Sequence, residues 1–212
     1  MKLAEATKSP TIMAANKELF DMLGSGTYGG SAEFLQKEIF DTVTFATADV
    51  TNAVKTFSFF DPSRSAAKTK ADTNLQTNQL PKGQHLSTQV LMLQAYRSDA
   101  TAITQANLLA LIQALQSSYM TVSIQGKAAS WDGPLSRILG LSLSAVGQEG
   151  SANNIIETFR MIANGNYVLN IPIVLEQLTT FNIDFSLTNA PTADLVGWSL
   201  RLSLSGGFVR AS

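Results

Sequence analysis

WSLRLSL, residues 198–204, alternates large apolar residues with polar ones at a period of two. The same alternation occupies YVLNIPIVL at 167–175 and FNIDFSL at 181–187. Successive side chains of a β-strand point to opposite faces of its sheet, so each stretch has one apolar face and one polar face. The three stretches therefore predict consecutive strands of an all-β, layered domain.

Strand patterns upstream of these bring the expected total to about eight. They lie at 42–47, 55–60, 86–97, 120–125 and 139–144. A long polar stretch at 61–84 separates the second from the third, and loops of this size usually serve binding or contact. Two shorter segments are predicted as turns, Trp-Asp-Gly-Pro at 131–134 and Asn-Gly-Asn at 164–166. Residues 153–163 are ambiguous, with a short helix as one interpretation.

Three helices are expected, two of them before residue 42 and one inserted within the β-domain. Residues 11–23 have helical composition and precede a glycine-rich break at 24–30. Ser31 is placed to cap a second helix, with strands starting only after Asp41. We therefore expect an N-terminal helical arm at 1–41 and one β-domain at 42–212. An inserted helix, capped by Asp99 or Thr101, is predicted from an apolar stripe of Leu108, Leu111, Ile112 and Leu115.

Composition narrows the classes of function. The chain has 212 residues and 45% hydrophobic content, enough to bury a core, yet only 15% are charged against roughly 25% in typical soluble proteins. Its 15 Lys and Arg nearly balance 16 Asp and Glu, so no net field attracts nucleic acid or acidic lipid. Cysteine is absent, which excludes disulfides and thiolate metal sites. Neither a secretory signal nor an apolar run of membrane-spanning length is present, and synthesis in the cytoplasm is the simpler expectation.

Two motifs associated with chemistry lack the context that the chemistry needs. Gly24, Gly26 and Gly29 match a dinucleotide-binding G-x-G-x-x-G, but a helical segment precedes them where a strand is required. A hinge beside the arm is the expected role. His85 is the only histidine, so it cannot form a two-histidine metal site, and its neighbours do not resemble a nucleophile elbow. We expect it at the mouth of a strand.

Acidic, basic and aromatic residues also favour structural roles. A glycosidase needs two carboxylates across a cleft, and the sequence gives no reason to pair any of Asp132, Glu157, Glu176 and Asp184. The basic residues of the long loop, Arg64, Lys68, Lys70 and Lys82, have no aromatic neighbours on which bases could stack. No specific nucleic-acid site is therefore predicted. Trp131 and Trp198 could stack on sugars, but Trp198 shares the register of Leu200 and Leu202, which favours the core.

Several local sequences carry a family resemblance. These are TNL at 73–75, QLPKGQ at 79–84 before a long apolar strand, IPI at 171–173 leading to FNI at 181–183, and the closing LRLSLSGGFVR at 200–210. Over roughly 43–210 the chain resembles the jelly-roll capsid proteins of tailless icosahedral bacteriophages, including those that enclose a membrane. The resemblance implies a mainly β fold, a single jelly-roll sandwich of about eight antiparallel strands with the N-terminal helical arm and one inserted helix.

The resemblance also implies what the protein does. Members self-assemble into capsomers of an icosahedral virion, with barrels upright, loops outward and N-terminal segments beneath neighbours. The expected partners are copies of the chain, other capsid proteins and, where one is enclosed, an internal membrane; the expected location is the virion. No catalytic, cofactor-binding or metal-binding residue belongs to the pattern, so none is predicted and the protein is expected not to be an enzyme. Many members fuse two rolls, whereas this chain accommodates one, which favours a single-roll major capsid protein over a minor or vertex protein.

Two other functions fit an all-β chain with polar strand faces. One is a carbohydrate-binding or adhesin-like β-sandwich, which would use Trp131 and Trp198. The other is a sandwich-fold glycosidase, which would use Glu and Asp residues. Loss of glycan binding on Trp131→Ala or Trp198→Ala, or loss of hydrolysis on one carboxylate-to-amide change, would distinguish them from a capsid subunit.

Overall fold

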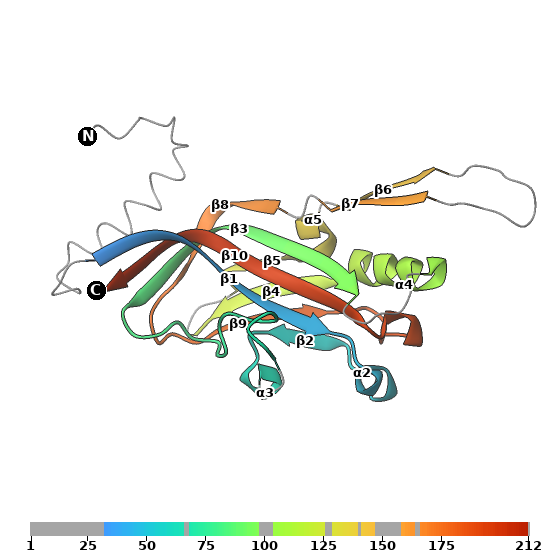
Figure 1. Cartoon of the computed structure of the whole chain (residues 1–212), viewed down its shortest axis with the longest axis horizontal. Helices are drawn as coiled ribbons and strands as arrows, with labels where there is room; N and C mark the ends of the chain where they lie inside the picture. The colour runs from blue at the N-terminus through green and yellow to red at the C-terminus, as the bar shows by residue number, and fades with distance from the viewer. Residues whose placement is uncertain are drawn as a thin grey trace, which may run out of the picture.

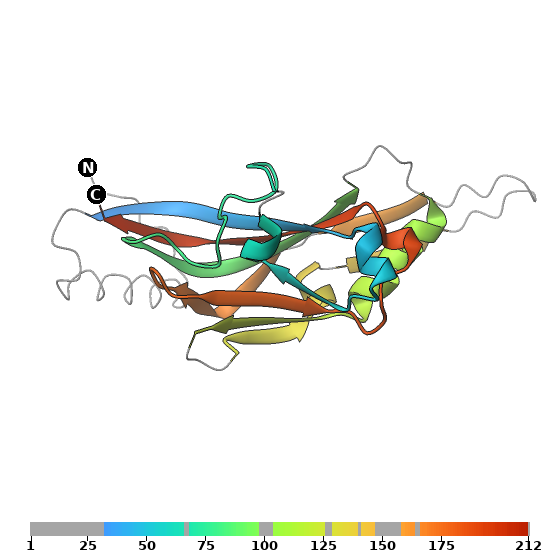
Figure 2. The same ribbon diagram turned by 90° about the horizontal axis from the view of Figure 1, so that it is seen from below.

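Two four-stranded antiparallel sheets pack face to face in the computed structural model, which describes residues 32–65, 68–97, 104–125, 129–139, 141–146, 158–163 and 166–211 (Figure 1). Sheet A has the order β1 (Ala32–Thr44), β10 (Trp198–Ala211), β3 (Gln84–Arg97) and β8 (Asn166–Leu175). Sheet B has the order β2 (Thr56–Phe59), β9 (Phe181–Ser186), β4 (Tyr119–Ile124) and β5 (Trp131–Pro134). Figure 2 shows the sheets as two layers.

Short helices and one hairpin connect the strands. The helices are α2 (Thr47–Thr51), α3 (Pro62–Ser65), α4 (Gln105–Gln116), α5 (Leu135–Leu139) and the 3-10 turn η1 (Ala193–Leu195). Strands β6 (Leu141–Val146) and β7 (Thr158–Ala163) pair with each other and extend away from the two sheets (Figure 1). Within the described ranges, every helix is too short or too polar to cross a bilayer.

The core is formed by the inward-facing residues that the alternating patterns predicted, except Ile171 of β8, which the pattern placed inside and which is 82% exposed. Phe185 of β9 is fully buried, and its ring lies 5.2 Å from Phe57, 5.3 Å from Phe59 and 6.3 Å from Phe45, measured between centroids. From sheet A, β10 contributes residues that are 2% exposed or less: Trp198, Leu200, Leu202 and Leu204. The two sheets thus share one hydrophobic core.

Most of the expected strands are confirmed. The three C-terminal stretches form β8, β9 and β10, and the stretches at 55–60, 86–97 and 120–125 form β2, β3 and β4. In its described part, the stretch at 61–84 is a long connection that contains the single turn α3 and isolated bridges at Gln79 and Leu80, and its last residue, Gln84, begins β3. The inserted helix is α4, but its N-cap is Thr104, whose Oγ1 accepts a hydrogen bond from the Asn107 amide. The other candidate caps, Asp99 and Thr101, lie outside the described residues.

The helix predicted to start at Ser31 is wrong, because residues 32–44 form β1 and pair with β10 along their whole length. The expected boundary at 41/42 thus falls inside a strand. Long-range pairing overrides the helical spacing of Leu35, Glu38 and Ile39. The arm helix at 11–23, the glycines at 24–30 and the first two residues of the 164–166 turn lie outside the described residues.

Three further predictions, all for the part of the chain between β4 and β8, are wrong. The Trp-Asp-Gly-Pro segment is the edge strand β5 and not a turn, since it pairs with β4. Leu139 ends α5, so the strand predicted at 139–144 is β6 and starts at Leu141. Residues 158–163 of the ambiguous segment form β7 and not a helix, because they pair with β6.

A β-bulge marks the middle of sheet A. Ser205 of β10 pairs with Val90 of β3 and Gly206 pairs with Thr88, so Gln89 is an extra residue on β3. The strands approach so closely here that a Cβ at Gly206 would lie 1.9 Å from the carbonyl oxygen of Ser87. Position 206 therefore requires glycine for space.

Candidate functional site

Two of the acidic residues considered for catalysis, Asp184 and Asp132, have a local structural partner. Asp184 on β9 accepts a 2.5 Å hydrogen bond from Ser58 Oγ on β2. Asp132 on β5 hydrogen-bonds Tyr119 on β4 and raises the pKa of that phenol. Glu157 lies outside the described residues. In the described ranges, no three acidic or histidine side chains are grouped as metal ligands would be.

His85 lies at the start of β3, where the sequence placed it. Its side chain is 7% exposed, and burial lowers its pKa, while the negative charge of Glu176 acts in the opposite direction. Because Leu86 pairs with Leu175, Glu176 and His85 occupy neighbouring ends of β8 and β3. His85 is therefore a buried residue at one end of sheet A.

The two tryptophans offer little surface for stacking on a sugar. Trp198 is 2% exposed, and the Arg97 guanidinium lies 5.8 Å from its ring centroid. Trp131 is partly buried, and its ring meets Tyr167 edge to face at 5.8 Å. Trp198 is thus a core residue, as predicted, and Trp131 helps to join the β5 edge of sheet B to the β8 edge of sheet A.

The long loop is anchored by one of its lysines. Lys68 Nζ lies 2.7 Å from Asp41 Oδ2, which also accepts a hydrogen bond from the Phe60 amide at 2.6 Å. The Asp41 side chain is 1% exposed and that of Lys68 is 11% exposed, so the ion pair is buried. Lys70 and Lys82 are exposed, and the side chain of Arg64 lies outside the described part. Of the basic residues predicted in this loop, Lys68 therefore has a structural role, because it fixes the loop to β1.

From Lys68 the chain crosses the free edge of β1, and we call residues 68–75 the strap. Asn74 pairs with this edge as a strand residue would: its amide donates to the Phe40 carbonyl at 3.2 Å and its Oδ1 accepts from the Phe40 amide at 2.8 Å. Its Nδ2 donates to the Glu38 carbonyl at 2.8 Å. Thr73 Oγ1 also donates to the Phe40 carbonyl at 3.2 Å. The strap thus satisfies peptide groups that a neighbouring strand would otherwise bind.

Arg201 holds the middle of the strap against the outer face of sheet A. One guanidinium nitrogen donates to the Ala71 carbonyl at 2.5 Å and to the Tyr96 hydroxyl at 3.2 Å, while Nε donates to Thr42 Oγ1 at 3.2 Å. The guanidinium also lies 5.0 Å from the Phe40 ring centroid. An open depression of about 480 Å³ beside it is lined by Gln94, Ala95, Tyr96 and Arg201. The hydrogen bonds of Arg201 are directed to the protein itself, so its position is structural.

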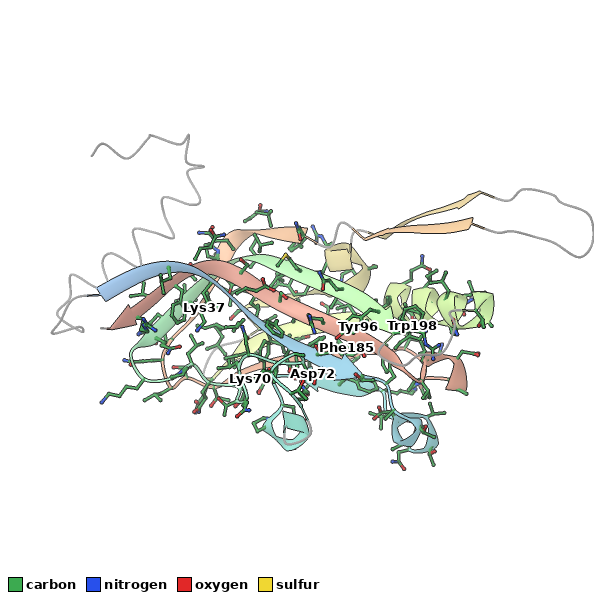
Figure 3. All side chains as sticks on the ribbon, viewed as in Figure 1. Lys37, Lys70, Asp72, Tyr96, Phe185 and Trp198 are labelled. Carbon is green, nitrogen blue, oxygen red and sulfur yellow. The ribbon has the colours of Figure 1, made fainter. Side chains whose placement is uncertain are left out.

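The strap should loosen in acid through Asp72. Asp72, labelled in Figure 3, accepts hydrogen bonds from the amide and hydroxyl of Thr69. These bonds lower the pKa of Asp72 below its usual 3.8, helped by the charges of Arg201 and Lys68. A lowered carboxyl pKa stabilises the folded strap above about pH 4 and loses this contribution as pH falls through the folded value. We expect amide exchange of Thr69, corrected for intrinsic rate, to accelerate as the pH falls below about 4. In Asp72→Asn this acceleration should be absent.

Two neighbouring positions on the β8 edge of sheet A expose apolar side chains. Among the described residues, the large apolar side chains that are exposed are Leu35, Leu109, Tyr119, Val168, Ile171 and Leu178. Val168 and Ile171, which we call the β8 patch, are 67% and 82% exposed. Residues 169–172 form a bend, because these four residues of β8 lie opposite the single residue Gln89 between the Val168–Val90 and Ile173–Thr88 pairs. β8 itself carries no charged residue, so this edge is suited to contact with another neutral surface.

No protein-family model matches the chain, and no curated protein is significantly similar to it in sequence. Its candidate functional surfaces are therefore defined by geometry alone. They are the strap over β1 at one edge of sheet A and the β8 patch at the other. Both can provide contacts to another protein, and neither brings together the groups that a covalent reaction needs.

Proposed function

We propose that the chain is a jelly-roll subunit of an icosahedral viral capsid, most simply a single-roll major capsid protein. The observation that carries the proposal is the nested pairing of the eight strands in the two main sheets. The first pairs with the last (β1 with β10), then β2 with β9, β3 with β8, and β4 with β5, all antiparallel. This is the order of one long hairpin, folded over so that β10 meets β3 and β9 meets β4.

Such a rolled hairpin supports a jelly roll, a fold common in viral capsid and lectin domains. The fold alone does not distinguish the two functions, so the surface has to decide between them. A lectin that stacked a sugar on its tryptophans would need their faces open, whereas Trp198 is buried and Trp131 is partly buried and packs edge to face with Tyr167. A shell subunit needs wide neutral contact areas. The low charge content and the β8 patch supply these, which favours the capsid.

Purified protein provides the test. We expect sedimentation velocity to show capsomer-sized species, and negative-stain electron microscopy to show rings or closed shells at high concentration. Binding to a glycan array is the matched measurement for the lectin alternative. A monomer that persists across protein and salt concentration would contradict the proposal, and saturable glycan binding by that monomer would replace it.

The β8 patch is expected to contribute to assembly. Ile171→Asp places a charge on a side chain that is 82% exposed, so thermal stability should change little, within about 0.5 kcal/mol. A charge that is buried at a contact without a partner costs free energy, so the critical concentration for assembly should rise about tenfold or more. Leu109→Asp on α4, where Leu109 is 50% exposed, is the control for the same change elsewhere. Equal assembly by all three proteins would exclude the β8 patch from the contact.

A further inference from the structure

The strap is attached to β1 mainly by polar contacts. Of its residues, only Thr73 is fully buried, Leu75 is partly buried against the core, and Thr69, Lys70, Ala71 and Asn74 are exposed. The bonds that join it to Glu38 and Phe40 are therefore accessible to water, which can replace them. Segments with few buried apolar contacts open at a lower free energy than the sheets beneath them. Apart from the buried Lys68–Asp41 ion pair, the strap is thus held by contacts of the kind that open before the sheets unfold.

We propose that the strap is a releasable cover, and that the β1 edge beneath it binds the β1 edge of a second copy of the chain by antiparallel strand addition. This inference rests on the proposed self-assembly and names the surface that one contact would use. Opening frees the Phe40 amide and the carbonyls of Glu38 and Phe40, which is the pattern that an incoming strand binds. The same edge is freed in every copy, so a two-fold contact can form.

The register of this contact follows from which peptide groups point outward. Glu38 and Phe40 bind the strap, so even-numbered residues must lie opposite even-numbered ones. A two-fold axis at Ile39 meets this condition and pairs Glu38 with Phe40 of the second copy. It also places Lys37 opposite Asp41 of the second copy, with no like charges directly opposed.

The Lys37–Asp41 pairing between the two copies would offset the loss of the Lys68–Asp41 ion pair when the strap opens. Release of the strap removes Lys68 from the buried Asp41 carboxylate, and Oδ1 of Asp41 has no hydrogen-bond partner within the described residues. A buried carboxylate that loses its counter-charge is strongly destabilising. Lys37 of the second copy would replace Lys68 at this position, twice in each dimer. The occupant that fits the edge is therefore another copy, and a neutral strand would fit it less well.

Asn74→Ala tests release, with Asn78→Ala as the matched control. Asn74 makes two side-chain hydrogen bonds to β1, whereas Asn78 is in the same loop and its side chain binds Asn182 on β9. Loss of the two bonds should speed exchange of the Phe40 amide about tenfold, with no change at β10 amides. Since both copies must open, the dimer dissociation constant from sedimentation should fall about a hundredfold. Asn78→Ala should change neither quantity.

Single cysteines test the register, because the natural chain has none. In the Asn74→Ala background, Ile39→Cys should form a disulfide-linked dimer on mild oxidation, since the two-fold axis passes through residue 39. Val43→Cys lies on the same face and is equally buried, but it would lie opposite Leu35, so it should not cross-link. Thermal unfolding of both variants confirms that each is folded before oxidation.

Three results would overturn the inference. They are exchange of the Phe40 amide only at the rate of global unfolding, faster exchange without a tighter dimer, and equal cross-linking at positions 39 and 43. Failure of the proposed function gives a different pattern. If wild-type protein never forms shells while Asn74→Ala dimerises through residue 39, the strap inference stands and the capsid proposal falls.

Discussion

Gly206→Ala is expected to yield little or no folded protein, the largest effect of any single methyl group in the described part of the chain. The added Cβ would lie 1.9 Å from the Ser87 carbonyl oxygen, 2.9 Å from its carbon and 3.0 Å from Thr88 Cα. These are backbone atoms of β3 and cannot rotate away. Gly206 is on β10, between β1 and β3, so relief would require separating strands at the centre of sheet A. We expect a loss of about 4 kcal/mol or more, a large part of the stability of a typical domain.

Urea unfolding followed by circular dichroism measures this loss, and two variants serve as controls. Gly133→Ala would bring its Cβ to 3.3 Å from the indole of Trp131, a side chain that can shift, so a loss of about 1 kcal/mol is expected. Ser205→Ala tests the adjacent position on β10, where a Cβ is already present. A Gly206→Ala protein as stable as Gly133→Ala would contradict the close approach of β3 and β10.

Phe185→Ala is expected to destabilise the protein by about 3–5 kcal/mol. Phe185 is fully buried and lies in the interior in Figure 3. Its ring stacks on Phe57 at 15° between planes and also contacts Phe45 and Phe59. Truncation would leave a cavity bordered by three other rings, which are held by β2 and by the segment after β1 and so can collapse only partly. Both the transfer free energy and the aromatic contacts would be lost.

The denaturation midpoint in urea reports this change, with Tyr119→Ala as the control. Tyr119 is also aromatic and lies on the neighbouring strand β4, but it is 47% exposed. Its truncation should cost within about 0.5 kcal/mol. Equal losses for the two variants would mean that Phe185 is not at the centre of the core.

The sequence predicts elements whose pattern is local. Alternation is unbroken in β9, and in β10 as far as Leu204, because one face is apolar there, and α4 has its apolar stripe within one segment. The part of β1 before Thr42 is predicted as a helix because Phe34, Leu35, Glu38 and Ile39 have helical spacing after a capping serine. Pairing with β10, far along the chain, determines its conformation instead. Likewise, Gly133 and Pro134 of β5 are residues typical of turns, but pairing with β4 makes this segment a strand.

The candidate surfaces were less predictable because they depend on which residues meet. Lys68 could be recognised only as one of several loop lysines, since its partner Asp41 lies across the long connection and was placed in a helical arm. Asn74 belongs to a sequence that contributed to the resemblance, but its role depends on the exposed edge of β1. The β8 patch could not be separated from core by alternation, because the bend at 169–172 changes which residues face the interior.

The nested order of the strands has a kinetic consequence. β1 ends at Thr44 and its partner β10 begins at Trp198, so contacts between them close one of the longest loops the chain can form. During synthesis at 5–20 residues per second, β1 waits roughly 8–30 s before β10 exists. Folding of such high contact order is slow, and until it ends both edges of β1 are open to other nascent chains. Expression yield should therefore depend on translation rate and on chaperones that hold emerging strands apart.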